Sequence, residues 1–276
     1  HGFSAEFSEH KVYNSGESTK HMDWKLYAKT DRLYTKRYEE ETNLRCHIII
    51  DNSSSMHYPK LSSGQLFYEN KIGFSVLASA VLMNILKKQR DAVGLSVFSD
   101  SYEYYAPEKG SDRHHRMLLN VLENLLENQT PKKTTDTVTY LHQIAEKMHR
   151  RSMILLFTDM FQSDEVSSSE EKLFAALQHL KHNKHKVVLF HVMDYKTELN
   201  FDFDSAPRRF VDLESGEEIA VFADTIKEFY EKKMQDYFEK VAMTCAQNKI
   251  KYIPVSVGEN FEKILTAYLI EKQNFG

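Results

Sequence analysis

From residue 43 onward, short apolar stretches alternate along the chain with longer stretches of helical periodicity. The short stretches are rich in β-branched and aromatic residues, as strands are, and lie at 44–51, 93–99, 153–158, 186–193 and 251–257. The helical stretches lie at 69–89, 113–128, 138–150, 170–182, 224–248 and 260–272. This alternation predicts an α/β fold: a doubly wound, Rossmann-like and mostly parallel sheet with helices on both faces.

Two segments do not follow the alternation. Residues 1–42 have too few apolar side chains to fold alone, so we expect an N-terminal arm that packs on a main domain of residues 43–276. In this arm Trp24, the only tryptophan, is expected to act as an anchor by burying its ring, with an interaction surface as the alternative. The acidic segment 195–222 has a hairpin signature at its centre, and we expect a β-hairpin insertion whose acidic residues are solvated.

Composition narrows the possible partners. The chain is 41% hydrophobic and 28% charged, as a globular protein is, and its net charge of −4 offers no basic surface for nucleic acid. The longest apolar run, 74–86, is too short to span a membrane. Two cysteines, Cys46 and Cys245, cannot form a disulfide framework and favour a reducing, cytoplasmic location.

Polar side chains follow two of the predicted strands. One buried strand ends at Asp51, and serines stand two and four positions later, at Ser53 and Ser55. Another apolar strand ends at Asp159. Because open parallel sheets bind ligands beyond the carboxyl ends of their strands, we expect these side chains to meet at one edge.

A threonine before the helix predicted at 138–150, either Thr134 or Thr135, can add a further hydroxyl. Carboxylates and hydroxyls form an all-oxygen set, which suits Mg²⁺ or Mn²⁺ and suits zinc or copper poorly. An ion held largely by neutral oxygens keeps much of its charge, so a carboxylate from a partner protein is a favourable further ligand. The alternative is an ordinary turn in which Asp51 ends its strand and the serines bind no metal.

This set of residues resembles the metal-ion-dependent adhesion site of von Willebrand factor A-type domains. Thr135 matches the threonine of that site better than Thr134 does, because Leu141 follows it by six positions. Where the family usually has two glycines before the threonine, this chain has Lys-Lys-Thr at 132–134. By position, the resemblance implies the metal ligands Asp51, Ser53, Ser55, Thr135 and Asp159.

The arm resembles the bacterial family catalogued as domain of unknown function 58. The resemblance rests on the segments 23–30 and 33–38, which precede an A-type domain in that family, although Lys29 stands where the family more often has arginine. It implies a non-enzymatic, divalent-metal-dependent protein-interaction module. It also implies an adaptor or chaperone-like role beside a MoxR-type AAA+ ATPase, which would donate an aspartate or glutamate to the metal.

The main enzymatic alternative is a metal-assisted phosphohydrolase that uses Asp51. Phosphatases of the haloacid-dehalogenase type need a second carboxylate two positions later as general acid, and this chain has Ser53 there. Phosphate-binding P-loop, nucleophile-elbow and zinc signatures are absent from the sequence, so we expect no catalytic residues. The histidine pairs at 114–115 and at 182 and 185 are expected on solvated helix faces rather than at a metal.

Overall fold

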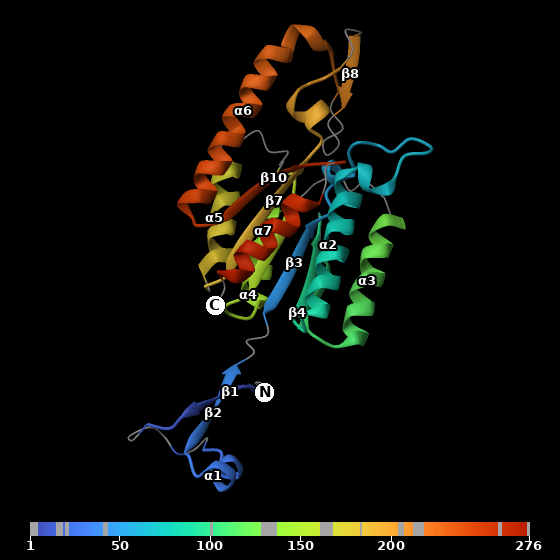
Figure 1. Cartoon of the computed structure of the whole chain (residues 1–276). Coiled ribbons are helices and arrows are strands. Elements are labelled where there is room, and N and C mark those ends of the chain that lie inside the picture. Colours follow the sequence, from blue (N-terminus) through green and yellow to red (C-terminus); the bar gives the residue numbers. More distant parts are fainter. Residues whose placement is uncertain are drawn as a thin grey trace. The chain divides into compact units, whose positions relative to one another are not determined.

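The computed structural model describes residues 5–14, 19, 22–40, 44–99, 102–127, 137–160, 168–182, 184–203, 207–211, 218–258 and 261–274. The chain divides into two compact units, residues 1–43 and residues 44–276 (Figure 1). Each unit is described by itself below.

A six-stranded sheet forms the centre of the larger unit, in the order β10-β7-β6-β3-β4-β5. Five strands run parallel, and β5 pairs with β4 in the antiparallel sense. The fold is the predicted α/β sheet with one antiparallel edge strand added. The strands are β3 (Arg45–Asp51), β4 (Ala92–Phe98), β5 (Tyr102–Lys109), β6 (Met153–Thr158), β7 (Lys186–Met193) and β10 (Lys251–Ser256).

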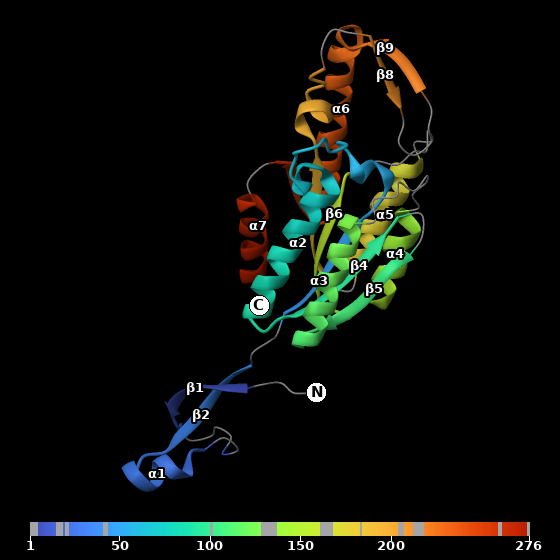
Figure 2. The ribbon, with the colours of Figure 1, turned by 90° about the vertical axis from the view of Figure 1, so that its right-hand side faces the viewer.

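Helices cover both faces of this sheet and create two hydrophobic cores (Figures 1 and 2). Successive side chains of β3 point to opposite faces, so Ile48 and Ile50 belong to one core and Ile49 to the other. Each contributes about 1.5–3 kcal/mol on burial. One face carries α2 (Lys71–Lys88), α3 (Asp112–Glu127) and α7 (Glu262–Gln273), and the other carries α4 (Thr137–Lys147), α5 (Ser168–His182) and α6 (Ala223–Gln247).

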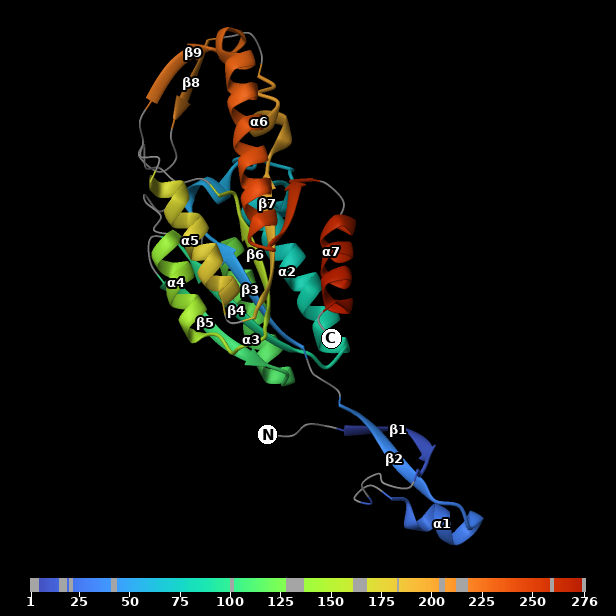
Figure 3. The same cartoon turned by 90° about the vertical axis from the view of Figure 1, so that its left-hand side faces the viewer.

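Between β7 and α6 the chain forms an insertion that rises beyond the carboxyl ends of the strands (Figures 1 and 3). It begins with η4 (Tyr195–Leu199), a single π-helical turn, and continues into the hairpin of β8 (Pro207–Val211) and β9 (Glu218–Phe222). The predicted hairpin is therefore present. Phe201, which follows η4, makes ring contacts with Phe210 of the hairpin and Tyr230 of α6 and so joins these parts.

The smaller unit pairs β1 (Ala5–Val12) with β2 (Tyr34–Glu40) and places α1 (Trp24–Thr30) between them in sequence. Asp23 caps α1 by accepting hydrogen bonds from the amides of Lys25 and Leu26. Within the smaller unit, the Trp24 side chain is 63% exposed and lies edge-on to the ring of Tyr27. The cap of Asp23 fixes the helix start, and burial of the Trp24 ring against the larger unit stays a prediction. Packing of the arm on the larger unit stays a prediction.

Three of the histidines expected on solvated faces are buried. His114 bonds the carbonyl of Val93 at 2.9 Å, and His185 accepts a hydrogen bond from the Ser152 amide at 3.1 Å. His115 is buried beside His114. The side chains of His114 and His185 satisfy backbone groups of neighbouring elements, a contact that sequence spacing does not reveal. Within the described ranges, no helix is both long enough and apolar enough to cross a membrane.

Candidate functional site

The loop after β3 holds its polar side chains together. Asp51 is buried, and its two carboxylate oxygens accept hydrogen bonds from the Thr158 hydroxyl at 2.7 Å and the Ser53 amide at 2.9 Å. The hydroxyl oxygens of Ser53 and Ser55 lie 3.1 Å apart. Thr158 thereby joins the end of β6 to the end of β3, as neighbouring parallel strands allow.

Asn52 fixes the conformation of this loop. Its backbone amide donates to the carbonyl of Phe98 at 2.8 Å, which extends the β3–β4 pairing by one step. Its side-chain amide donates to Glu103 at 3.0 Å, and its side-chain oxygen lies 3.0 Å from Nε2 of His57. Because the backbone and side chain of Asn52 are both held by hydrogen bonds, the neighbouring Asp51 has a fixed orientation at the edge of the sheet.

The electrostatic environment of Asp51 is unfavourable for a bare carboxylate. Burial, and next the negative charge of Asp159, raise the pKa of Asp51 to about 7, although hydrogen bonds from Thr158 and Ser53 oppose the shift. None of the described groups that act on this pKa is a cation. A buried carboxylate without a counterion is a group that a bound cation stabilises.

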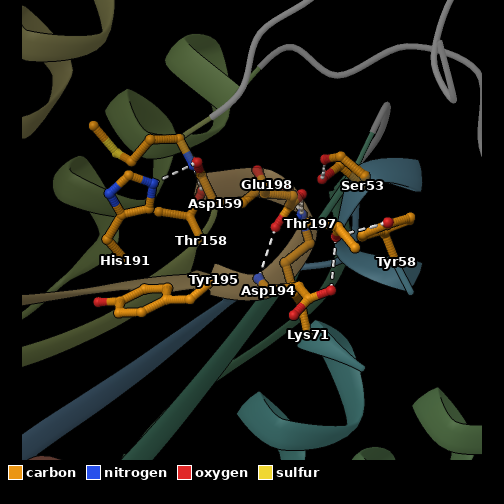
Figure 4. Close-up of polar contacts among 12 residues, drawn as sticks. Ser53, Tyr58, Lys71, Thr158, Asp159, His191, Asp194, Tyr195, Thr197 and Glu198 are labelled. Atoms are coloured by element: carbon orange, nitrogen blue, oxygen red, sulfur yellow. Dashed lines mark hydrogen bonds and ion pairs between the residues drawn. The ribbon is translucent and has the colours of Figure 1, made fainter. Parts of the chain in front are cut away.

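Asp159 follows β6 and is engaged by a lysine (Figure 4). The Lys71 ammonium lies 2.8 Å from Asp159 and 2.6 Å from Glu198, and its side chain is fully buried. Burial lowers the pKa of Lys71, but the two carboxylates outweigh this effect and hold the pKa above its usual value. Lys71 therefore stays charged and bridges two acidic groups.

The start of α2 places Lys71. Asn70 caps the helix by accepting a hydrogen bond from the Gly73 amide at 2.8 Å. A Cβ on Gly73 would lie 1.8 Å from the backbone oxygen of Phe67, so only glycine lets the preceding turn approach this closely. A lysine in the first turn of a helix opposes the helix dipole, which is a signal in the sequence for a nearby carboxylate.

Glu198 corrects the expectation that the acidic segment 195–222 is simply solvated. Its carboxylate accepts from Lys71 and, at 2.8 Å, from the amide of Asp194, and its backbone carbonyl accepts from Tyr230 at 2.8 Å. The segment folds back over the sheet edge through η4, so this acidic residue is turned inward. Only the folded turn reveals which of the many acidic residues is turned inward and partly buried.

His191 supports the backbone of Asp159 from the next strand, β7. Burial lowers the pKa of His191 to about 4, so its ring is neutral at physiological pH. We assign Nε2 as the protonated nitrogen that donates to the Asp159 carbonyl at 2.8 Å, with Nδ1 accepting from the Tyr252 hydroxyl at 2.8 Å. The ring thus fixes the chain where β6 ends, without adding charge to the site.

Four of the five predicted ligands lie at one edge of the sheet. Asp51, Ser53 and Ser55 share the β3 loop, and Asp159 is close enough for its charge to act on Asp51. Thr135, like Thr134 beside it, lies outside the described residues, so its role stays a prediction. The described helix α4 begins directly afterwards, at Thr137, and runs back toward the start of β6.

The residues at this edge fit a hard divalent cation. Within the described parts of the chain, no three His, Cys, Asp or Glu side chains gather closely enough to hold a metal by themselves. The donor set consists instead of the Asp51 carboxylate with two adjacent hydroxyls, which magnesium and manganese accept and zinc disfavours. Among the described residues, the ionised forms of Asp51, Asp159 and Glu198 give three negative charges against the one positive charge of Lys71, a net of −2 that one such ion balances.

Metal-free protein is expected to lose stability as the pH rises from about 4 to about 7. The Asp51 pKa is 3.8 in a model peptide and about 7 in the folded protein, so the folded state binds the additional proton between these values. Urea denaturation in the presence of a chelator measures the effect, with Asp51→Asn as the reference. If Asp51→Asn loses stability between about pH 4 and about pH 7 as steeply as the wild type does, the effect does not come from the raised pKa of Asp51.

The fold and the site together define a class of protein: a von Willebrand factor A-like domain with a strand-terminal aspartate and a serine-containing loop. The family model described as "Protein of unknown function DUF58" matches residues 9–260. The chain belongs to this family.

Solved structures support the fold. BatB, a conserved hypothetical protein from Bacteroides thetaiotaomicron, aligns with a TM-score of 0.51 at 14% identity over 84% of this chain and 100% of its own. An aerotolerance-related membrane protein from Bacteroides fragilis aligns with a TM-score of 0.51 at 17% identity over 84% of this chain and 99% of its own. No curated protein matches the sequence.

Proposed function

We propose that this protein is a non-enzymatic interaction module that binds a partner protein through a divalent cation, Mg²⁺ or Mn²⁺. The observation that carries the proposal is the Asp51 carboxylate, which is buried beside two hydroxyls and has no cation among the described groups acting on it. Asp51, Ser53 and Ser55 would hold the ion, with Asp159 near it. The bound ion supplies a positive centre that attracts a carboxylate.

The partner is proposed to contribute that carboxylate from an aspartate or glutamate. Ser55 is half-buried whereas Ser53 and Asp51 are buried, so the outer side of the loop is the side from which a ligand can approach. A MoxR-type AAA+ ATPase is the proposed partner, and the cytoplasm the proposed location, on the basis of family resemblance. The two buried, reduced cysteines suit that location.

The local chemistry gives little support to a phosphohydrolase. Ser53 stands where a general acid is needed, and its hydroxyl is paired with Ser55. Lys71, the cation of this cluster, is bonded to Asp159 and Glu198. Hydrolysis of an aryl phosphate with Mg²⁺ that disappears in Asp51→Asn would overturn the non-enzymatic proposal.

Three serines in one loop provide a matched test. Ser53→Ala and Ser55→Ala are each expected to weaken Mn²⁺ binding by roughly tenfold or more, because each removes one proposed ligand. Ser54→Ala is the control: its hydroxyl lies between them in sequence, is buried, and has no hydrogen-bond partner in the described structure. Titration calorimetry measures the affinities, and capture of the AAA+ partner with and without chelator measures the interaction.

The proposal fails if Ser53→Ala and Ser55→Ala bind Mn²⁺ as tightly as Ser54→Ala does. It also fails if the partner is captured equally well in the presence of a chelator. Equal binding in all three variants would assign the loop to an ordinary strand-terminal turn.

A further inference from the structure

The turn η4 lies outside the metal-site motif. It is hydrogen-bonded to three neighbouring elements: the β3 loop, α2 and α6. Tyr58, at the end of the β3 loop, donates to Thr197 at 2.8 Å. Lys71 of α2 bonds Glu198, and Tyr230 of α6 donates to the Glu198 carbonyl. Figure 4 shows η4 beside Ser53, Lys71 and Asp159.

Glu198 and Asp159 share the same cation. The Lys71 ammonium lies 2.6 Å from Glu198 and 2.8 Å from Asp159, so neither carboxylate has it alone. The Asp159 charge also acts on Glu198, which places the two carboxylates in one electrostatic unit. A change in the charge of Glu198 therefore alters how strongly Lys71 neutralises Asp159.

We propose that Glu198 is a positioning residue of the metal site, which raises the affinity for the divalent cation through Lys71 without coordinating the ion. This inference rests on the proposed function. Because Glu198 shares the Lys71 ammonium, Lys71 neutralises Asp159 less completely. Glu198 also supplies one of the negative charges that give the cluster its net charge of −2. Because Glu198 belongs to η4, the same contact ties the hairpin–α6 insertion to the ion.

Glu198→Gln is expected to weaken Mn²⁺ binding by roughly tenfold, because the cluster charge falls from −2 to −1 and Lys71 turns fully to Asp159. Glu198→Asp keeps the charge and is expected to stay within about threefold of the wild type. Asp194→Asn is the matched control: it removes a carboxylate at the start of the same turn, bonded to Thr197 and the Lys196 amide.

The experiment is a Mn²⁺ titration of the full chain, followed by the electron paramagnetic resonance signal of free Mn²⁺, with urea denaturation in chelator run alongside. A purely structural role for Glu198 would lower the stability of Glu198→Gln and leave its Mn²⁺ affinity unchanged, and that result overturns the inference. Should Glu198→Gln not fold, Glu198→Ala, which places no amide against the Asp194 N–H, provides the same comparison.

The two proposals fail in distinguishable ways. Wild-type protein that leaves the Mn²⁺ signal unchanged at millimolar concentrations overturns both. If the wild type binds Mn²⁺ and both Glu198→Gln and Asp194→Asn bind it with the same affinity, only the role of Glu198 is overturned. A tenfold loss in Asp194→Asn as well would show that any charge on η4 has the effect, which contradicts the specific route through Lys71.

Discussion

Asp51→Asn is expected to have two opposite effects: higher stability without metal and loss of stabilisation by metal. At pH 8 the folded wild type holds an ionised, buried carboxylate whose pKa is raised to about 7. Asparagine removes that charge, so metal-free stability should rise by on the order of 4 kcal/mol, the equivalent of a pKa shift from 3.8 to about 7. The variant also lacks the charged ligand, so Mn²⁺ affinity should fall by more than about a hundredfold.

Asparagine is the suitable replacement because it keeps polar atoms where Asp51 has them. Its oxygen can accept from the Ser53 amide, and its amide can donate to the Thr158 hydroxyl, which accepts at present from the Met160 amide. Alanine would leave the Ser53 amide and the Thr158 hydroxyl proton without the acceptor that Asp51 provides.

Asp91→Asn is the control for Asp51→Asn. Asp91 is also buried at a strand end, but it bonds the Leu44 amide and the Lys272 ammonium at the opposite edge of the sheet. Its replacement should lower stability and leave the response to Mn²⁺ unchanged. Urea denaturation with chelator or with Mn²⁺ measures both variants. If Asp51→Asn is still stabilised by Mn²⁺ as the wild type is, Asp51 is not a ligand.

Lys71→Met is expected to destabilise the protein by about 3–5 kcal/mol, because it removes the cation that bridges the buried carboxylate of Asp159 and the partly buried one of Glu198. The same change raises the negative charge of the cluster, so added Mn²⁺ should restore more stability to this variant than to the wild type. The measurement is urea denaturation at neutral pH, in chelator and again in millimolar Mn²⁺.

Lys87→Met, on the same helix, is the matched control. Lys87 also pairs with an aspartate, Asp112, but both side chains are largely exposed, so water compensates for the loss. Its stability should stay close to that of the wild type. A Lys71→Met variant that is as stable as Lys87→Met would show that the buried bridge contributes little.

The parallel sheet could be predicted from the sequence because its strands are buried on both faces. Stretches such as 153–158 read as continuous apolar runs between helical patterns, and the structure has β6 at those bounds. The edge strand β5 carries no such signal: it contains Pro107 and is only partly buried. An edge strand needs only one partner, so its sequence is less constrained.

The residues of the candidate site could likewise be predicted from the sequence only in part. Asp51, Ser53, Ser55 and Asp159 could be predicted because spacing along one loop and order at one sheet edge are properties of the sequence. Lys71 and Glu198 lie 127 positions apart, and their bond depends on η4 folding back over the edge. No periodicity encodes that contact. The unfavourable position of Lys71 in the first turn of α2 is the one local signal.

The most direct test of the account is an anomalous difference map from crystals of the full chain grown with Mn²⁺. We predict one peak at the end of β3, about 2.1 Å from the hydroxyl oxygens of Ser53 and Ser55 and next to Asp51. Lys71 should still lie against Glu198. A map with no peak at this loop, in crystals where the side chains of Asp51 and Asp159 are ordered, would contradict the central claim that this edge of the sheet is a metal site.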